Sequence, residues 1–248
     1  MRDNASWRRT FRLVPACVAV LAAALAAQSP YTAAQLDGAR FDEQVNTDVV
    51  SRSGTADVHR VMARSARYGV GVAADTVIVT ADSLMLSQTT DGAAHDYDVN
   101  GVVGGHWKFF VDSAGRARIV ASPFVPDAIA EVSDLTTAMD DFLPPRPPPM
   151  QPRTASDADH RRWQRLADSA GMARYTWVAD NRTDTQSTIA DTVAVHVKQT
   201  SHEESQVVWD PVRGPVRWER RIHVEVRTEV RARLVDAVVT QHVTVVRE

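Results

Sequence analysis

His223 and Glu225 are the two residues whose types and spacing come nearest to a catalytic or metal site. They are two positions apart in an alternating stretch, so on a β-strand both side chains point to the same face. An imidazole beside a carboxylate could bind a metal ion or transfer protons, with a third ligand from His196 or His242 on a neighbouring strand. The alternative is a solvated cross-strand charge pair, because no recognised ligand spacing surrounds them.

Arg220 is the second unusual residue, because it interrupts an apolar series. One parity of the stretch carries Val216, Trp218, Arg220, Ile222, Val224 and Val226, and the other carries Arg217, Glu219, Arg221, His223, Glu225 and Arg227. Side chains alternate between the faces of a strand, so the first set predicts an apolar face and the second a solvated face. Arg220 either reaches water at an edge or is a buried cation that holds a ligand carboxylate or an aspartate.

Tryptophans supply the candidate ligand-binding surface. Trp107 and Trp218 fall on predicted strands, and together with Arg220 and Val224 they could line an apolar site on a concave sheet. The alternative is that the tryptophans form the core under the predicted helices, which is the commoner location of such residues.

Motifs that indicate an enzyme are absent from the sequence. It contains no Gly-x-Ser-x-Gly elbow, phosphate-binding loop, His-Glu-x-x-His motif or EF-hand loop. The only cysteine, Cys17, lies in the N-terminal leader, so the mature chain would have no thiolate nucleophile or thiolate metal site. We therefore favour a non-enzymatic protein without a cofactor, and keep a metal-dependent or acid–base enzyme using His223, Glu225 and Arg220 as the alternative.

The elements that position these residues are mainly β-strands. Apolar alternation and turn residues predict a hairpin from Phe41 to Ala66 around Arg52–Thr55, and strands over 70–86 interrupted near Asp75 and Asp82. A hairpin with its turn at Asp112–Gly115 follows, and a turn at Asp210–Gly214 precedes the strongest strand pattern. Further strands are predicted near 173–180, 189–200, 206–209 and 234–247.

Two helices are expected on either side of a proline-rich stretch. Ile129, Val132, Leu135, Met139 and Phe142 recur every three or four residues, which predicts a helix over 127–142. Trp163, Leu166, Ala167 and Ala170, with Ser156 or Asp157 as the N-cap, predict a second helix over 157–170. Between them, residues 143–156 contain six of the twelve prolines and are expected to form a stiff polyproline II spacer.

The N-terminus has the features of a secretory signal peptide. Arg2, Arg8, Arg9 and Arg12 precede a short apolar run from Leu13 to Ala27, with small residues for cleavage after Ala26 or Ala27. The run is shorter than the roughly 20 apolar residues of a spanning helix, so we expect an exported periplasmic or extracellular protein with no membrane span after processing. A retained signal anchor is the alternative.

The charge of the chain argues against a nucleic-acid partner. The net charge is −3, and the leader carries four arginines and one aspartate, so cleavage would lower the net charge to −6. An acidic chain lacks the basic surface that phosphate backbones require.

These observations give a mainly β (α+β) protein with curved antiparallel sheet or sheets. Expected segments are a signal peptide (1–27), a flexible segment (28–38), a first β-unit with a C-terminal helix (39–142), the proline-rich spacer (143–156) and a second β-unit with an N-terminal helix (157–248). The two tandem β-units could form a half-barrel, and the sequence leaves open whether they share one sheet or make two domains.

The leader, the Asp112–Gly115 hairpin and the Phe142–Pro145 stretch together resemble a group of uncharacterised bacterial secreted proteins and lipoproteins, and more distantly the half-barrels of periplasmic lipoprotein and lipid carriers. That resemblance implies a concave apolar pocket without catalytic residues. Its expected partner is an apolar or lipid ligand, or another protein of the cell envelope. The chain differs from an acylated member because Cys17 lacks a proper apolar region before it, which argues against a lipid tether.

Overall fold

The computed structural model describes residues 33–248 except 75, 112–116, 131–134, 136–138, 140–141, 149, 151–152, 158, 190–192 and 231–232. The predicted signal peptide therefore lies outside the described residues. Residues 31–248 form one compact unit. Among the described residues, no helix is long and apolar enough to cross a membrane.

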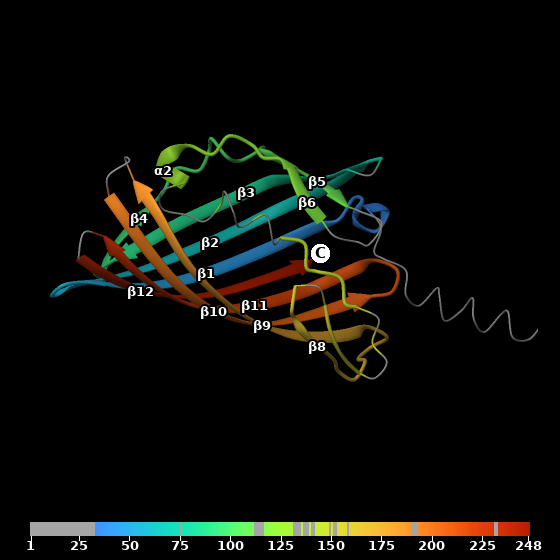
Figure 1. The fold of residues 1–248 in the computed structure, drawn as a ribbon. Coiled ribbons are helices and arrows are strands. Elements are labelled where there is room, and N and C mark those ends of the chain that lie inside the picture. Colours follow the sequence, from blue (N-terminus) through green and yellow to red (C-terminus); the bar gives the residue numbers. More distant parts are fainter. Residues whose placement is uncertain are drawn as a thin grey trace, which may run out of the picture. The chain divides into compact units, whose positions relative to one another are not determined.

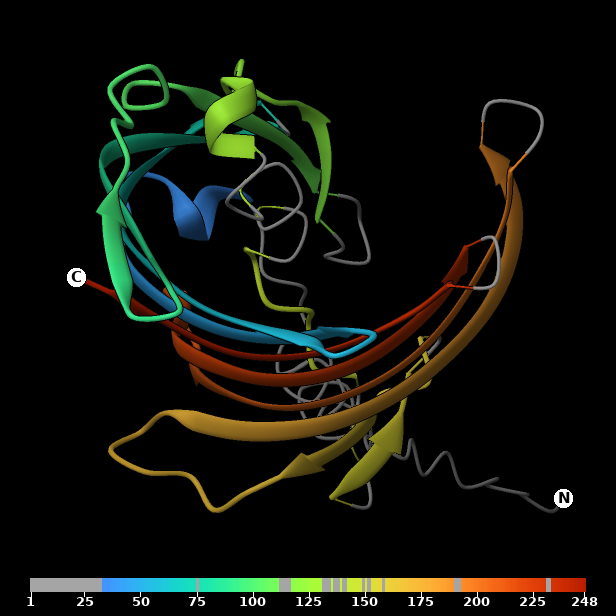
Figure 2. The same ribbon diagram turned by 90° about the vertical axis from the view of Figure 1, so that its left-hand side faces the viewer.

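The fold is one large, curved and unclosed antiparallel sheet (Figures 1 and 2). The first half of the chain supplies β1 (Arg40–Ser53), β2 (Ala56–Ala73), β3 (Thr76–Thr90), β4 (Ala93–Asp96), β5 (His106–Val111) and β6 (Ala117–Ala121). The second half supplies β7 (Thr154–Ser156), β8 (Arg162–Arg165), β9 (Ala173–Ile189), β10 (Val193–Asp210), β11 (Gly214–Val230) and β12 (Arg233–Arg247). The helical elements among the described residues are a 3-10 turn, η1 (Ala33–Leu36), and α2 (Asp127–Ala130).

The two halves of the chain share this sheet. The strand order is β6-β5-β3-β2-β1-β12-β11-β10-β9-β8-β7, with β4 paired to β3. The first and last long strands, β1 and β12, pair over thirteen residue positions from Phe41–Arg247 to Ser53–Val235. The prediction of a mainly β, curved antiparallel fold is confirmed, and of the two arrangements left open the structure has the continuous sheet.

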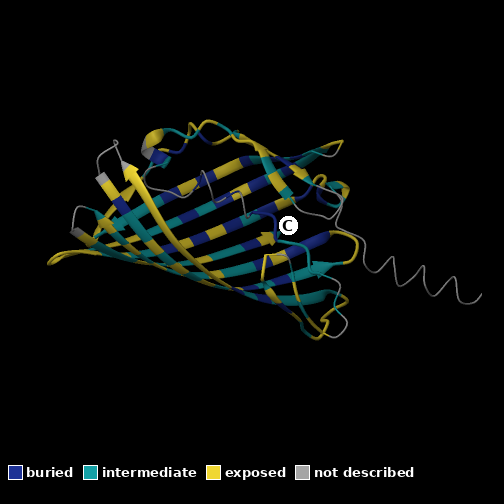
Figure 3. Cartoon of the chain, viewed as in Figure 1, coloured by how far each residue is buried: buried dark blue, intermediate teal, exposed yellow. Residues whose placement is uncertain are grey.

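Alternating side chains explain why these segments become strands. Along β1 the odd residues Phe41, Glu43, Val45 and Thr47 are buried, and the even residues between them face solvent or are half-buried. Figure 3 shows the same alternation of buried and exposed positions on neighbouring strands. An extended backbone places alternate residues on opposite faces, so one apolar parity can pack while the other is solvated.

The turns predicted at Arg52–Thr55 and Asp210–Gly214 lie where the sequence placed them, and the turn predicted at Asp112–Gly115 lies outside the described residues. Gly54 joins β1 to β2 and Gly214 ends the β10–β11 turn, with φ angles of +63° and +80° that favour glycine. The break predicted near Asp82 is a β-bulge: Arg67 pairs with Ser83 and Tyr68 with Ala81, so Asp82 is the extra residue and β3 continues past it.

The core fills one end of the concave face. Phe41 of β1 and Trp218 of β11 contact Phe142 with ring centroids 5.8 and 5.9 Å away, and Tyr68 of β2 contacts it at 4.9 Å. Leu36 of η1 is fully buried in the same cluster, so packing begins inside the segment expected to be flexible (28–38). In Figure 2, η1 and α2 lie inside the curve of the sheet.

The prediction of a helix over residues 157–170 is wrong. Arg162–Arg165 form strand β8, which pairs with both β7 and β9. Trp163 is buried against Trp177 of β9, with ring centroids 4.7 Å apart. Asp157 accepts the backbone N–H groups of Asp159 and Arg161, both at 3.0 Å, so it closes a local turn and caps no helix. The stripe from Trp163 to Ala170 was a coincidence of spacing.

The helix predicted over 127–142 and the proline-rich segment are only partly described. Asp127–Ala130 are helical as α2, and Ile129, Leu135, Met139 and Phe142 are all buried as the stripe predicted. The residues between these positions lie outside the described residues. Leu143 and Pro144 are buried and residues 145–148 half-buried, so this part of the expected spacer packs against the protein.

Candidate functional site

The concave face of the sheet is the candidate site, because its buried and half-buried side chains form continuous rows across the long strands. One row, reading from β10 to β1, is Val207–Trp218–Val245–Glu43, and the next is Ser205–Arg220–Val243–Val45. Farther from the core come Glu203–Ile222–Gln241–Thr47, then Ser201–Val224–Val239–Val49. From the first row to the last, the concave face changes from the aromatic core to charged and polar groups, and then to valines.

Trp107 and Trp218 belong to the core and not to an open surface. Their exposed fractions are 0% and 1%. The Trp107 ring packs edge-on against Tyr68 at 6.2 Å, and Trp218 packs against Phe41 at 5.3 Å. A charged side chain at position 218 would therefore disrupt packing, and could not report ligand contact.

Arg220 is a largely buried cation, with 14% of its side chain exposed, and its carboxylate partner comes from the protein. Its Nε donates to Glu203 Oε1 at 3.0 Å, and its Nη2 donates to Oε2 at 3.3 Å. Trp177 Nε1 and Ser205 Oγ also donate to Glu203 Oε1, at 3.2 and 2.7 Å. Burial acts to raise the pKa of Glu203, but the charge and hydrogen bonds of Arg220, with help from Ser205, leave that pKa below its ordinary value.

A second buried ion pair lies on the other side of β12. Arg64 of β2 donates from Nε to Glu43 Oε2 at 3.1 Å and from Nη2 to Oε1 at 3.3 Å. The two side chains are only 4% and 3% exposed. Tyr68 Oη donates to Glu43 Oε2 at 3.1 Å. Between the two ion pairs, Gln241 Nε2 donates to Thr47 Oγ1 at 3.1 Å.

We call these groups together the charged belt: Glu43, Thr47, Arg64, Glu203, Arg220 and Gln241. Each of its charges is neutralised by a partner of opposite sign, and its polar atoms are largely used in hydrogen bonds within the belt. The belt therefore marks a polar boundary across the concave face, and it does not offer an uncompensated charge to a ligand.

Beyond the belt lies the valine patch, which we define as Val49, Val197, Val224, Val226, Val235 and Val239. Val224, Val239 and Val49 stand directly opposite one another on β11, β12 and β1. Val226 lies opposite Ala237, and Val235 and Val197 both lie opposite Thr228. All six side chains are half-buried. Val224, a predicted ligand-binding residue, is therefore in an accessible apolar surface.

The patch is large enough for an extended apolar chain. From the row of Val224 to the row of Thr228 along β11, the patch spans about 13 Å at the strand rise of about 3.3 Å per residue. The four strands β1, β12, β11 and β10 add about 14 Å in width, at about 4.8 Å per strand. Ser201 and Gln199 of β10 border the patch with polar groups.

His223 and Glu225 lie on the convex face, away from this site. His223 Nε2 is 3.6 Å from Glu225 Oε1, and their side chains are 47% and 66% exposed. The cross-strand neighbour of His223 is His202, which the sequence did not suggest, whereas His196 and His242 lie opposite Glu229 and Arg221. Among the described residues, no group of three or more His, Cys, Asp or Glu side chains could hold a metal ion.

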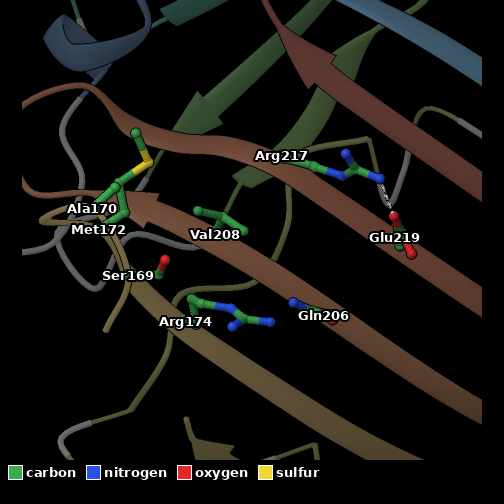
Figure 4. Close-up of a pocket in the computed structure, with 8 residues that line it drawn as sticks. All are labelled: Ser169, Ala170, Met172, Arg174, Gln206, Val208, Arg217 and Glu219. Atoms are coloured by element: carbon green, nitrogen blue, oxygen red, sulfur yellow. Dashed lines mark hydrogen bonds and ion pairs between the residues drawn. The ribbon is translucent and has the colours of Figure 1, made fainter. Parts of the chain in front are cut away.

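A hollow of about 390 Å³ also lies on the convex side (Figure 4). Arg217 donates to Glu219 within it, so that guanidinium already has an anionic partner. Ala170 and Gly171, with φ angles of +51° and +76°, form the turn at its rim. The lining residues are Ser169, Ala170, Met172, Arg174, Gln206, Val208, Arg217 and Glu219. None of the residues predicted for ligand binding contributes to it.

Sequence reasoning missed Glu203, Glu43 and Arg64. The available signal was the one that singled out Arg220: a charged residue on the apolar parity of a strand. Glu43 alternates with Phe41 and Val45, and Glu203 with Ser205 and Val207. Their pairing could not be found from spacing, because the partners are 21 and 17 residues apart and meet only through strand register.

Comparison with known proteins supports the fold class and goes no further. No family model and no curated protein matches the chain. Among solved structures, the sheet is similar to lipovitellin, in a structure titled for its lipid–protein interactions, with a TM-score of 0.54 and 7% identity. The alignment covers 86% of this chain and 25% of the lipovitellin chain, so this chain spans a quarter of that length. At this identity the likeness shows a shared curved β-sheet fold.

Proposed function

We propose that the protein binds an apolar ligand, the acyl chain of a lipid, on the valine patch of its concave face. The observation that carries this proposal is the set of six half-buried valines on β1, β12, β11 and β10, which with Ala237 and Thr228 cover three adjacent rows of the concave face. The similarity to lipovitellin supports it, because that structure is described by its lipid–protein interactions.

The energetics set the minimum size of such a ligand. Each buried methylene contributes about 0.8 kcal/mol. Association costs at least about 4 kcal/mol in lost translational and rotational freedom. About five methylenes offset this cost, so roughly ten must leave water before binding becomes useful, and a patch about 13 Å long can accept an extended chain of about that size.

Binding of a fluorescent long-chain fatty acid to the purified protein tests the proposal. Val239→Asp should weaken binding at least tenfold, because the carboxylate would have to be desolvated beneath an acyl chain. Val238→Asp is the matched control: Val238 is the neighbouring residue of β12, points to the opposite face and is 38% exposed. Thermal unfolding of both variants checks that the sheet is intact.

Native mass spectrometry after mild purification provides a second measurement. Co-purified lipid that is lost in Val224→Asp, with unchanged unfolding temperature, supports the carrier function. A clean mass of the protein alone, together with no fatty-acid binding, eliminates it. The concave face would then be assigned to docking of another protein of the cell envelope, the other partner that the sequence analysis left open, for which this protein would be a scaffold.

We further propose that the protein is exported to the periplasm or the cell exterior and processed. The basic residues Arg2 to Arg12 and the apolar run to Ala27 support this. N-terminal sequencing of the protein from the envelope fraction should find a start at Ala27 or Gln28. Membrane-embedded protein that begins at Met1 would instead show a retained signal anchor.

A further inference from the structure

Strand β9 presents a long unpaired edge. It runs from Ala173 to Ile189, but β8 pairs only with its residues Tyr175 to Val178. In the described part of the chain, no strand or backbone hydrogen bond covers the outer side of residues 179–188. Residues 180–188 are all exposed, whereas the inner side of the strand is paired with β10 along its whole length.

The hydrogen-bonding groups of this edge belong to the even-numbered residues. Leu166 N donates to Arg174 O at 2.9 Å, so the backbone of Arg174 faces away from β10. In an antiparallel ladder the N–H and C=O of one residue face the same neighbour, and the direction alternates from residue to residue. The β9–β10 register has no shift, so Asp180, Arg182, Asp184 and Gln186 also direct their backbone groups outward.

This edge lacks most of the features that prevent strand addition. Residues 181–188 read Asn-Arg-Thr-Asp-Thr-Gln-Ser-Thr, with no proline, glycine or lysine, and β9 shows no bulge in its pairing with β10. Exposed edges normally carry such features because unpaired backbone groups attract other strands. Three threonines add β-propensity. Both faces of residues 181–188 are polar, so the strand that would pair with this edge is expected to be polar as well.

The stretch is complementary to itself. If two copies pair antiparallel about a twofold axis at Thr183, Arg182 of each copy lies opposite Asp184 of the other on the convex face. The outward-facing residues then form the hydrogen-bonded pairs, as the ladder requires. In this register residues 179–187 of one copy run beside 187–179 of the other, so the overlap begins where β8 ends at Val178.

The charges of the edge fit this arrangement. Among the described side chains, Arg182 forms no ion pair with a carboxylate of the same chain. Asp184 Oδ1 lies 2.5 Å from His196 Nε2, and its Oδ2 lies 3.9 Å from Lys198 Nζ. The side chain of Asp184 is 53% exposed, so its carboxylate is still accessible to an arginine of a second copy.

We propose that the partner of the β9 edge is a second copy of this chain, which pairs antiparallel through residues 179–187 and extends the curved sheet across a twofold axis. This inference does not depend on lipid binding, because the concave valine patch and the β9 edge use different residues.

Sedimentation equilibrium of the full chain tests the proposal through a charge exchange. The wild-type protein should form a dimer. Arg182→Asp and Asp184→Arg should each raise the dimer dissociation constant at least tenfold, because like charges then face each other at both symmetry-related positions. The double variant Arg182→Asp/Asp184→Arg should restore dimerisation.

A cysteine cross-link tests the register itself, in a Cys17→Ser background that removes the only native thiol. Thr183→Cys places two thiols opposite each other at the twofold axis, in a non-hydrogen-bonded pair whose Cα atoms lie about 4.5 Å apart. This separation is within the range that a disulfide spans. Mild oxidation should yield a covalent dimer. Thr185→Cys is the control, because its thiols would be about 13 Å apart.

A wild-type monomer at all concentrations would overturn the proposal. So would a dimer that neither single charge reversal weakens, or equal cross-linking through positions 183 and 185. Gln186→Pro removes an outward N–H while sparing the β10 ladder, and should also favour the monomer, whereas Gln186→Ala should not. Unfolding temperatures of all variants confirm that they are folded.

Discussion

Arg220 of β11 and Glu203 of β10 form an ion pair on the concave face, with Arg220 Nε 3.0 Å from Glu203 Oε1. Their side chains are 14% and 18% exposed. The carboxylate that Arg220 holds thus comes from the protein itself, and one oxygen of that carboxylate also accepts hydrogen bonds from Trp177 and Ser205. The pair and its hydrogen bonds link strands β9, β10 and β11 beside the valine patch.

Removal of the cation alone should be costly. Arg220→Met leaves the largely buried Glu203 without its ion-pair partner, and we expect the free energy of unfolding to fall by about 3 kcal/mol. Arg220→Met/Glu203→Gln should recover most of this loss, because the neutral amide oxygen can still accept from Trp177 and Ser205. Urea unfolding of the three proteins measures both effects. A double variant no more stable than Arg220→Met would contradict this account.

Acid should weaken the fold through Glu203. The pKa of Glu203 in the folded protein is lower than its ordinary value of 4.5, through Arg220 and Ser205 acting against burial. Its contribution to stability is therefore complete above the unfolded pKa and is lost as the pH falls through the lowered folded pKa. Unfolding free energies measured from about pH 6 to pH 3 should fall less steeply for Glu203→Gln than for wild type. Parallel curves would show that Glu203 does not carry the effect.

Two arginines of β2 should differ sharply in their contribution to stability. Arg64 and Arg67 both pair with acids of β1, but Arg64 is 4% exposed and Arg67 is 51% exposed. Arg64→Met should destabilise the protein by about 3–5 kcal/mol, because it leaves the buried carboxylate of Glu43 without its ion-pair partner. Arg67→Met should change the stability much less, since the exposed pair with Asp42 is solvated. Equal losses by urea unfolding would refute this distinction.

His202 should stay protonated to a higher pH than an ordinary histidine. The pKa of His202 is raised, first by its hydrogen bond to Asp180, whose Oδ1 lies 2.6 Å from His202 Nδ1. Any stabilisation from this pair is therefore present below the unfolded pKa and is lost as the pH rises through the raised folded value. An NMR titration of the ring protons should show a lower pKa in Asp180→Asn. An unchanged midpoint would remove Asp180 as the cause.

The sequence by itself determined the class of structure and much of its local form. Alternation at 216–227 predicted a strand with one apolar and one charged face, and the structure has this arrangement along β11. The turns at Gly54 and Gly214 were predictable, because each is formed by a short segment that contains a glycine with a positive φ angle. These features depend on the backbone and its nearest neighbours, so a single sequence contains them.

Prediction from local patterns failed where one sequence pattern is compatible with two secondary structures. Asp157 followed by Trp163, Leu166 and Ala170 has the form of a capped amphipathic helix, but the same aspartate can close a turn through nearby N–H groups. Pairing of β8 with β9, and burial of Trp163 on Trp177, decided in favour of the strand. That contact lies in the tertiary structure, and helix propensity is too weak to resist it.

Only the tertiary structure decided the candidate site. Strand order and register bring Glu203 to Arg220 and Glu43 to Arg64. Packing of Phe41 and Phe142 against Trp218 buries that residue, whereas Val224 on the same strand stays accessible. The pairing of β1 with β12 likewise joins the two ends of the folded chain into one sheet. Such long-range pairings arise because a whole apolar face is buried together, and spacing along the chain does not contain that information.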